Sequence, residues 1–131
     1  MIYALMLVLS CVALVHFGVF YWRALVAGVA AEPLSERMQA VAGDTLGADD
    51  FNRVLCYQKM CPGLDSQSGG TGAVRLYYRM LTVMKNSLGA VVPQISDWTN
   101  REMATCSRYV AVVTDQRLQR NLAHAAEINS Y

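Results

Sequence analysis

The first stretch of the chain, Met1–Trp22, reads MIYALMLVLSCVALVHFGVFYW and contains no charged side chain. At a rise of about 1.5 Å per residue, a helix over this stretch spans roughly 33 Å, enough for a hydrocarbon core of about 30 Å. Apolar residues occupy all of its sides, so it has no polar face for water. Tyr21 and Trp22 fall where aromatic rings meet lipid headgroups, and Arg23 follows at once. The stretch therefore predicts a transmembrane helix.

The helix is expected to continue beyond the membrane to residue 31, because no strong helix breaker precedes Pro33. The alternative is a cleaved signal peptide, for which Val29, Ala30 and Ala31 resemble a small-residue cleavage site. However, no basic segment precedes the apolar run, and the run exceeds the about 7–15 residues usual in signal peptides. We expect residues 1–31 to form a retained membrane anchor with its extension.

Charges near the span set the expected orientation. Arg23 and Arg37 follow it, whereas the terminal amine alone precedes it. Because basic segments stay on the cytoplasmic side, the soluble domain is expected to face the cytoplasm from the cell (inner) membrane. Its three cysteines would then be reduced thiols, whereas a domain facing outward could pair Cys56 or Cys61 with Cys106.

Residues 32–131 fit one small domain. The chain is 54% hydrophobic with a net charge of +1, which gives no general reason to bind nucleic acid. The charge is uneven, however: residues 32–72 hold three basic and six acidic side chains, and residues 73–131 hold seven basic and four acidic ones. The difference favours packing of the two halves against each other, or an acidic partner for the basic half.

The expected fold is all-α: a single transmembrane helix followed by a small bundle of three to four helices. Apolar residues recur with helical spacing in four segments, and no segment reads as a strand. The glycine- and serine-rich segment 62–72 is expected to be a flexible loop. Thr99 and Glu102 fit a capping box for the last helix, with Ser96 or Asp97 as alternative caps. The expected helices cover residues 34–42, 49–61, 73–88 and 97–128.

His16 is an ionisable residue inside the predicted span, which makes it a functional candidate. A neutral imidazole there could ligate haem iron or the magnesium of a chlorophyll. The position resembles the histidine of single-span light-harvesting polypeptides, and this resemblance implies a pigment ligand, although Val12 stands where that family usually has alanine. The other interpretation, which we favour, is a hydrogen bond to a neighbouring helix of a complex.

The segment 73–88 carries a second candidate site. Arg75 and Arg79 lie one helical turn apart and repel each other, which suggests contact with lipid phosphates, acidic side chains or a partner subunit. Tyr77 and Tyr78 lie beside them, and Tyr and Arg are enriched at protein interfaces. The alternative is a solvated basic face with the tyrosines in the core. The predicted interface residues are Arg75, Arg79, Tyr77, Tyr78 and Trp22.

Catalytic and metal-binding patterns are weak. Cys56, Cys61, Cys106 and His124 are potential zinc ligands, but they form no CxxC or HxxxH spacing, so buried structural thiols are expected instead. The turn 69–72 could hold an anion, yet it lacks the lysine and hydroxyl of a P-loop and is expected to be a connector. We expect no enzymatic activity, no metal and no bound cofactor.

Together these features predict a single-pass, membrane-anchored accessory subunit of a larger membrane protein complex, such as an energy-converting one. Its role would be assembly, stabilisation or docking, with other membrane-protein subunits and the lipid bilayer as partners and no nucleic acid. One alternative is a tetrapyrrole-binding component that uses His16. Another is a small enzyme or redox protein that uses Cys56, Cys61 or Cys106.

Overall fold

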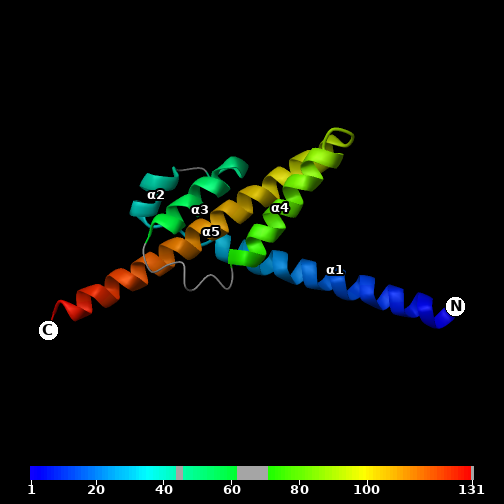
Figure 1. Ribbon diagram of the computed structural model, residues 1–131, viewed down its shortest axis with the longest axis horizontal. Helices are drawn as coiled ribbons and strands as arrows, with labels where there is room; N and C mark the ends of the chain where they lie inside the picture. The colour runs from blue at the N-terminus through cyan, green and yellow to red at the C-terminus, as the bar shows by residue number, and fades with distance from the viewer. Residues whose placement is uncertain (44–45, 62–70, 131) are drawn as a thin grey trace.

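The computed structural model describes residues 1–43, 46–61 and 71–130, which are helical without any strand (Figure 1). The long apolar first helix and the helical bundle that follows it confirm the predicted all-α fold. The elements are α1 (Ile2–Ala30), α2 (Glu36–Ala42), the 3₁₀ turn η1 (Ala48–Asp50), α3 (Phe51–Met60), α4 (Thr71–Leu88) and α5 (Pro93–Ile128).

Helix α5 is the central element of the fold. Its 36 residues extend for roughly 54 Å, and α1, α2, η1, α3 and α4 all pack on it. The residues of α5 that the other helices cover lie between Thr99 and Asp115, whereas almost all of 116–130 is exposed. The C-terminal part of α5 therefore projects beyond the bundle (Figure 1).

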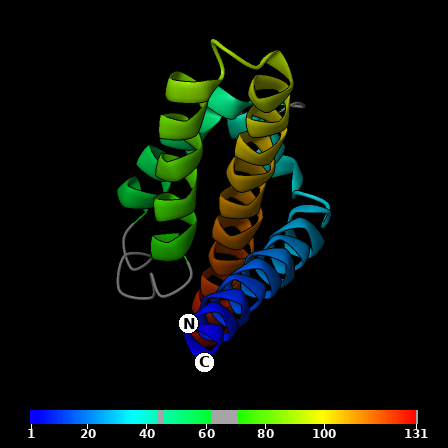
Figure 2. The same ribbon diagram turned by 90° about the vertical axis from the view of Figure 1, so that its right-hand side faces the viewer.

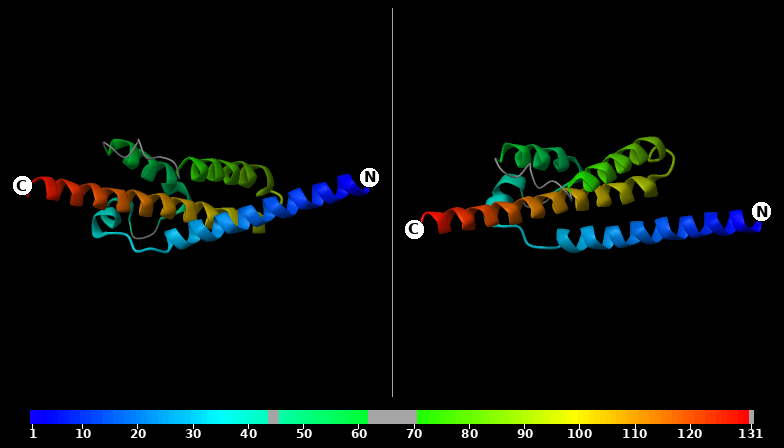
Figure 3. Two further views of the ribbon diagram at one scale, coloured as in Figure 1. Left: turned by 90° about the horizontal axis from the view of Figure 1, so that it is seen from below. Right: turned by 60° about the horizontal axis from the view of Figure 1, so that its bottom comes forward.

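Helices α1 and α5 run in the same direction. Arg23 of α1 contacts Glu102, and Glu32, just past the end of α1, contacts Gln116 further along α5. Figure 3 shows the consequence: the N-terminal part of α1 extends past the beginning of α5, and the C-terminal part of α5 extends past the end of α1. The free ends of the two longest helices thus lie at opposite ends of the molecule.

Helices α4 and α5 form an antiparallel hairpin whose short connector follows Leu88. The sequence-based start of the last helix at residue 97 is wrong, because α5 begins at Pro93, whose ring suits the first helical turn. The predicted capping box is also wrong. Thr99 lies inside α5 and donates to the carbonyl oxygen of Ile95 at 2.8 Å, while Glu102 contacts α1.

The beginning of α4 also differs from the sequence-based prediction. Residues 62–70 of the expected loop lie outside the described residues, but Thr71 and Gly72 are helical and form the first turn of α4. At α2 the prediction is confirmed: Ser35 caps the helix by accepting from the Met38 N–H at 3.4 Å, and Gly43 ends it with φ +79°.

The hydrophobic core lies where α2, α3 and α4 meet the middle of α5. At its edge the rings of Phe51 and Tyr78 stack, with centroids 3.9 Å apart and planes inclined by 9°. Such stacking joins α3 to α4. The buried cluster consists of Met38, Phe51, Val54, Val74, Leu81, Met103, Cys106, Val110 and Ala111.

Candidate functional site: the apolar helix α1 and its junction

The N-terminal two-thirds of α1 is exposed on every side. Each residue from Met1 to Tyr21 is solvent-accessible and none is covered by another part of the described chain. Among the described helices, α1 is the one long and apolar enough to cross a membrane. Because its apolar side chains surround the helix completely, its exposed part suits hydrocarbon better than water.

His16 lies on this exposed part of α1. It borders a shallow hollow of about 450 Å³ that is otherwise lined by Cys11, Val12, Val15 and Val19. The imidazole therefore has apolar side chains around it and room for a neighbouring helix or ligand. Within the described residues no group of three or more His, Cys, Asp or Glu side chains could hold a metal ion.

Arg23 joins the exposed part of α1 to the bundle. Its Nη2 atom lies 2.5 Å from Glu102 Oε1, and its guanidinium carbon lies 5.3 Å from the ring centre of Trp98, within cation–π range. The other carboxylate oxygen, Glu102 Oε2, accepts from the Tyr77 hydroxyl at 3.1 Å. One carboxylate of α5 therefore connects α1 with α4.

This junction is partly shielded from water. The side chain of Arg23 is 39% exposed and that of Glu102 is 16% exposed. Burial, reinforced by the negative charge of Glu102, raises the pKa of Tyr77 well above its ordinary value. Tyr77 therefore stays protonated at physiological pH and keeps donating to the carboxylate. Val26 and Ala30, one and two turns further along α1, are buried and hold the same interface.

A second contact fastens the chain just after α1. The buried carboxylate of Asp115 accepts from the Ser35 backbone N–H at 2.8 Å and from the Ser35 hydroxyl at 2.5 Å. Gln116 donates to the carboxylate of Glu32. Since Glu32 precedes Pro33 and Ser35 follows it, the segment between α1 and α2 is held against α5 at both of its ends.

Four of the five predicted interface residues lie in α4 and separate into two groups. Arg75 is half-buried and Arg79 exposed, and neither forms an ion pair within the part of the chain that is described. Tyr77 and Tyr78 point inward: Tyr77 donates to Glu102, and Tyr78 donates to the carbonyl oxygen of Ala48 at 2.6 Å. Partner contact by the tyrosines stays a prediction, but their hydroxyls are already used within the chain.

The fifth predicted interface residue, Trp22, is half-buried and packs against the edge of the core, next to Arg23. Trp22 and Arg23 therefore lie where the exposed part of α1 ends and its contact with α5 begins. An amphipathic ring and a cation at this position match the usual flank of a membrane span.

The thiols do not form a common site. All four cysteines are free, and burial raises the pKa of Cys106 to about 12, so it is an inert core residue as expected. The expectation of burial is wrong for Cys56, which is exposed, and Cys61 is half-buried. Cys56 lies within α3, Cys61 follows the end of that helix in an extended conformation, and His124 lies on the exposed C-terminal part of α5.

Sequence reasoning missed the two contacts that fix α1 and its exit to α5. Arg23 and Glu102 are 79 positions apart, and Ser35 and Asp115 are 80 positions apart. The one available signal was the lone cation at the end of an apolar helix, which needs a partner once it is partly buried.

Comparison with known proteins gives no relative: no protein-family model, no curated protein and no solved structure matches this chain.

Proposed function

We propose that this protein is a single-pass, membrane-anchored accessory subunit of a larger membrane protein complex, which it helps to assemble, stabilise or dock. The proposal rests on one observation. The same helix that is exposed and apolar from Met1 to Tyr21 continues without interruption into the bundle, where Arg23, Val26 and Ala30 fasten it to α5. An anchor that only tethered the domain would not need α1 to be packed against α5, whereas a subunit that must present its domain in a fixed orientation would.

Within the membrane, the face with His16 is the proposed contact for another subunit. A polar imidazole surrounded by lipid is unfavourable unless it finds a hydrogen-bonding partner, and the described chain supplies none. The hollow beside it, between Val12, Val15 and Val19, offers space for side chains of a second helix. The partner is therefore a membrane protein with a hydrogen-bonding group at this depth.

The domain is proposed to lie on the cytoplasmic face of the cell membrane, because Arg23 and Arg37 follow the span closely. The proposal includes no catalytic step. It includes no nucleic acid either, because the net charge of +1 gives no general electrostatic reason to bind it.

The test is co-purification of the full chain from native membranes in a mild detergent, comparing His16→Ala with Phe17→Ala. Both residues are exposed on α1, but Phe17 is not part of the hollow. We expect defined partner proteins at a fixed stoichiometry with the parent chain and with Phe17→Ala, and several-fold less partner with His16→Ala. A parent chain that is extracted as a clean monomer would contradict the proposal.

The same samples decide the tetrapyrrole alternative. If His16 ligates a haem or chlorophyll, the purified parent sample absorbs visible light, and His16→Ala loses that absorption while Phe17→Ala keeps it. If His16 binds a protein helix instead, as we propose, the absorption spectra of both variants match that of the parent sample.

A further inference from the structure

The outer face of α4 is apolar and uncovered. Leu76, Met80 and Val83 are 66%, 61% and 64% exposed, and their spacing of four and three residues places them in one stripe along the helix. With Arg79 they border a shallow hollow of about 380 Å³. An exposed stripe of this kind marks a surface that contacts something apolar.

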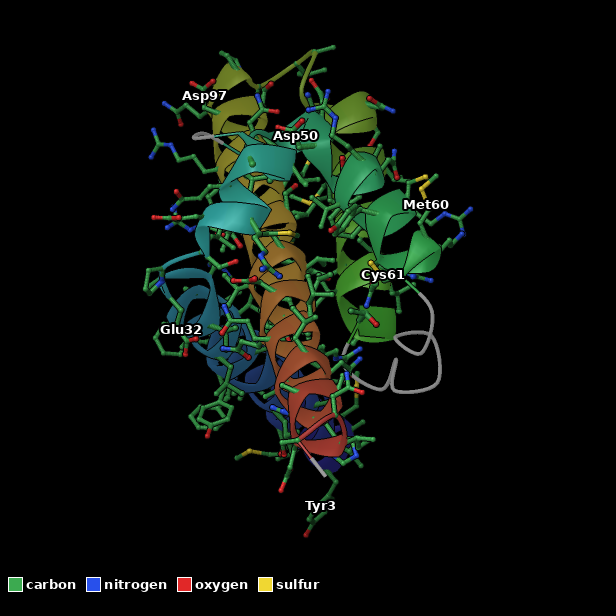
Figure 4. All side chains as sticks on the ribbon, turned by 90° about the vertical axis from the view of Figure 1, so that its left-hand side faces the viewer. Tyr3, Glu32, Asp50, Met60, Cys61 and Asp97 are labelled. Carbon is green, nitrogen blue, oxygen red and sulfur yellow. The ribbon has the colours of Figure 1, made fainter. Side chains whose placement is uncertain are left out.

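The stripe faces the same end of the molecule as the N-terminal part of α1. Tyr78, on the opposite side of α4, reaches Ala48 and Phe51 in η1 and α3, so the stripe points away from these elements. Figure 2, seen from the end where α1 begins, shows α4 in front of α3. Figure 4, seen from the opposite end, shows α3 with Met60 and Cys61 in front of α4.

The middle of α4 is also held at the level where α1 leaves its exposed apolar part. Arg23 directly follows that part, and Glu102 links Arg23 to Tyr77 in α4. In Figures 1 and 2 α4 is steeply inclined to α1 and does not follow its direction. A membrane crossed by α1 up to Trp22 would therefore have α4 lying along its surface.

The charges of α4 suit such a surface. The helix carries Arg75, Arg79 and Lys85 and no acidic residue, so it complements anionic headgroups. Arg79 borders the apolar stripe, in the position that a phosphate-binding cation takes on an interfacial helix. The tip of the hairpin continues the pattern: residues 86–96 contain no charge, and Leu88 and Val91 are exposed.

We propose that α4 is an interfacial helix that rests on the same bilayer that α1 crosses. Leu76, Met80 and Val83 enter the boundary between headgroups and acyl chains, and Arg79 binds lipid phosphate. This inference rests on the proposed anchoring by α1, and adds a second, sideways contact with anionic lipid. The domain is then held to the membrane by two helices at different angles.

The test uses the full chain with Cys11, Cys56 and Cys61 changed to serine, which leaves the buried Cys106 as the sole native thiol. A polarity-sensitive fluorophore is attached at Val83→Cys or, as matched control, at Leu122→Cys. Leu122 is also an exposed aliphatic residue on a helix, but it lies on the far, C-terminal part of α5. The proteins are reconstituted into vesicles of phosphatidylcholine and phosphatidylglycerol that contain lipids with a quencher in the acyl chain.

We expect several-fold stronger quenching at position 83 than at position 122. Met80→Glu should reduce quenching at position 83 several-fold while the protein still floats with the vesicles through α1. Omission of phosphatidylglycerol should weaken the quenching at position 83, because Arg79 loses its anionic partner. Circular dichroism confirms that each variant is folded, and the comparison of positions 83 and 122 decides the outcome without Met80→Glu.

Equal, weak quenching at both positions in a protein that floats with the vesicles would overturn the interfacial role of α4 but leave α1 as the anchor. The proposal would also be overturned if the fluorophore at position 83 were shielded from water in native membranes but not in vesicles of pure lipid. In that case a protein partner, and not lipid, would cover the stripe. Loss of flotation itself would remove the anchor, and both proposals would fail together.

Discussion

Arg23 and Glu102 form the contact that orients α1 on the bundle. Arg23 lies at the end of the exposed part of α1, and its guanidinium lies 2.5 Å from the carboxylate of Glu102 in the N-terminal third of α5. Because the same carboxylate accepts from Tyr77, one side chain fixes the positions of α1 and α4 relative to the central helix.

Loss of this ion pair should loosen the junction measurably. Glu102→Gln keeps an oxygen for Tyr77 but removes the charge, and we expect the free energy of unfolding to fall by about 1–2 kcal/mol, a value reduced by the partial exposure of Arg23. Chemical denaturation in detergent, followed by tryptophan fluorescence, measures the change.

Arg53→Gln is the matched control for that prediction. Arg53 pairs with Asp50 at 3.5 Å but is 68% exposed, so its loss should cost less than about 0.5 kcal/mol. Equal effects of Glu102→Gln and Arg53→Gln would show that the junction contributes no more than an ordinary surface pair.

The contact between Ser35 and Asp115 predicts that removing the carboxylate costs more stability than removing the hydroxyl. Asp115→Ala leaves the Ser35 N–H and hydroxyl without their shared acceptor in a buried place, and should cost about 2–3 kcal/mol. Ser35→Ala should cost about 1 kcal/mol, because Asp115 still accepts from the backbone N–H. Thermal unfolding of both variants gives the order, and a larger loss for Ser35→Ala would contradict this arrangement.

Cys106 should make the protein less stable in alkali. Burial raises the pKa of this thiol to about 12, whereas an unfolded cysteine has a pKa of about 8.5. Between these values the unfolded chain releases a proton that the folded chain keeps. The free energy of unfolding therefore falls as pH rises, by at most about 1.4 kcal/mol per pH unit.

Denaturation at a series of pH values above about 8 measures this slope, and Cys106→Ala is the variant to compare, because it lacks the titrating thiol. Because Cys106→Ala also removes packing contacts of the sulfur, the pH dependence of the free energy of unfolding is the readout, and its absolute value is not. A slope that is unchanged in Cys106→Ala would contradict the assignment. In the parent chain at pH 8, thiol reagents should modify the exposed Cys56 much faster than Cys106.

Gly89 should tolerate no side chain. A Cβ atom there would lie 2.3 Å from the carbonyl oxygen of Lys85, which also accepts the Gly89 N–H at 3.0 Å. Gly89→Ala must therefore distort the turn of the hairpin, and we expect a loss of about 1–3 kcal/mol in thermal unfolding. Gly72→Ala is the control: no neighbour lies near its Cβ position, so it should be neutral or stabilising.

Local signals in the sequence located most of the helices, because capping and periodicity act over a few residues. Ser35 and Gly43 mark the ends of α2, and the core-facing side of α4 includes both Val74 and Leu81. The helical spacing of Tyr77 and Tyr78 places them with this core-facing side, so the spacing indicates their inward direction. The interface prediction for the two tyrosines depended on their basic neighbours, Arg75 and Arg79, and not on this spacing.

Tertiary contacts could not be found in this way. No local rule pairs Arg23 with Glu102 or Ser35 with Asp115, because the pairing depends on the parallel course of α1 and α5. The start of α5 was missed for a related reason: Pro93 reads equally well as the end of a connector and as the first residue of a helix, and packing against α4 decides between them.

The parallel course of α1 and α5 also gives the molecule a fixed reach. Glu102 lies at the level of Arg23, and 26 further residues of continuous helix lead from Glu102 to Ile128. At about 1.5 Å per residue this part of α5 is roughly 39 Å long, and its end is exposed beyond the bundle, on the side away from the exposed part of α1 (Figure 1). The end of α5 is therefore accessible to a partner that does not touch the apolar part of α1.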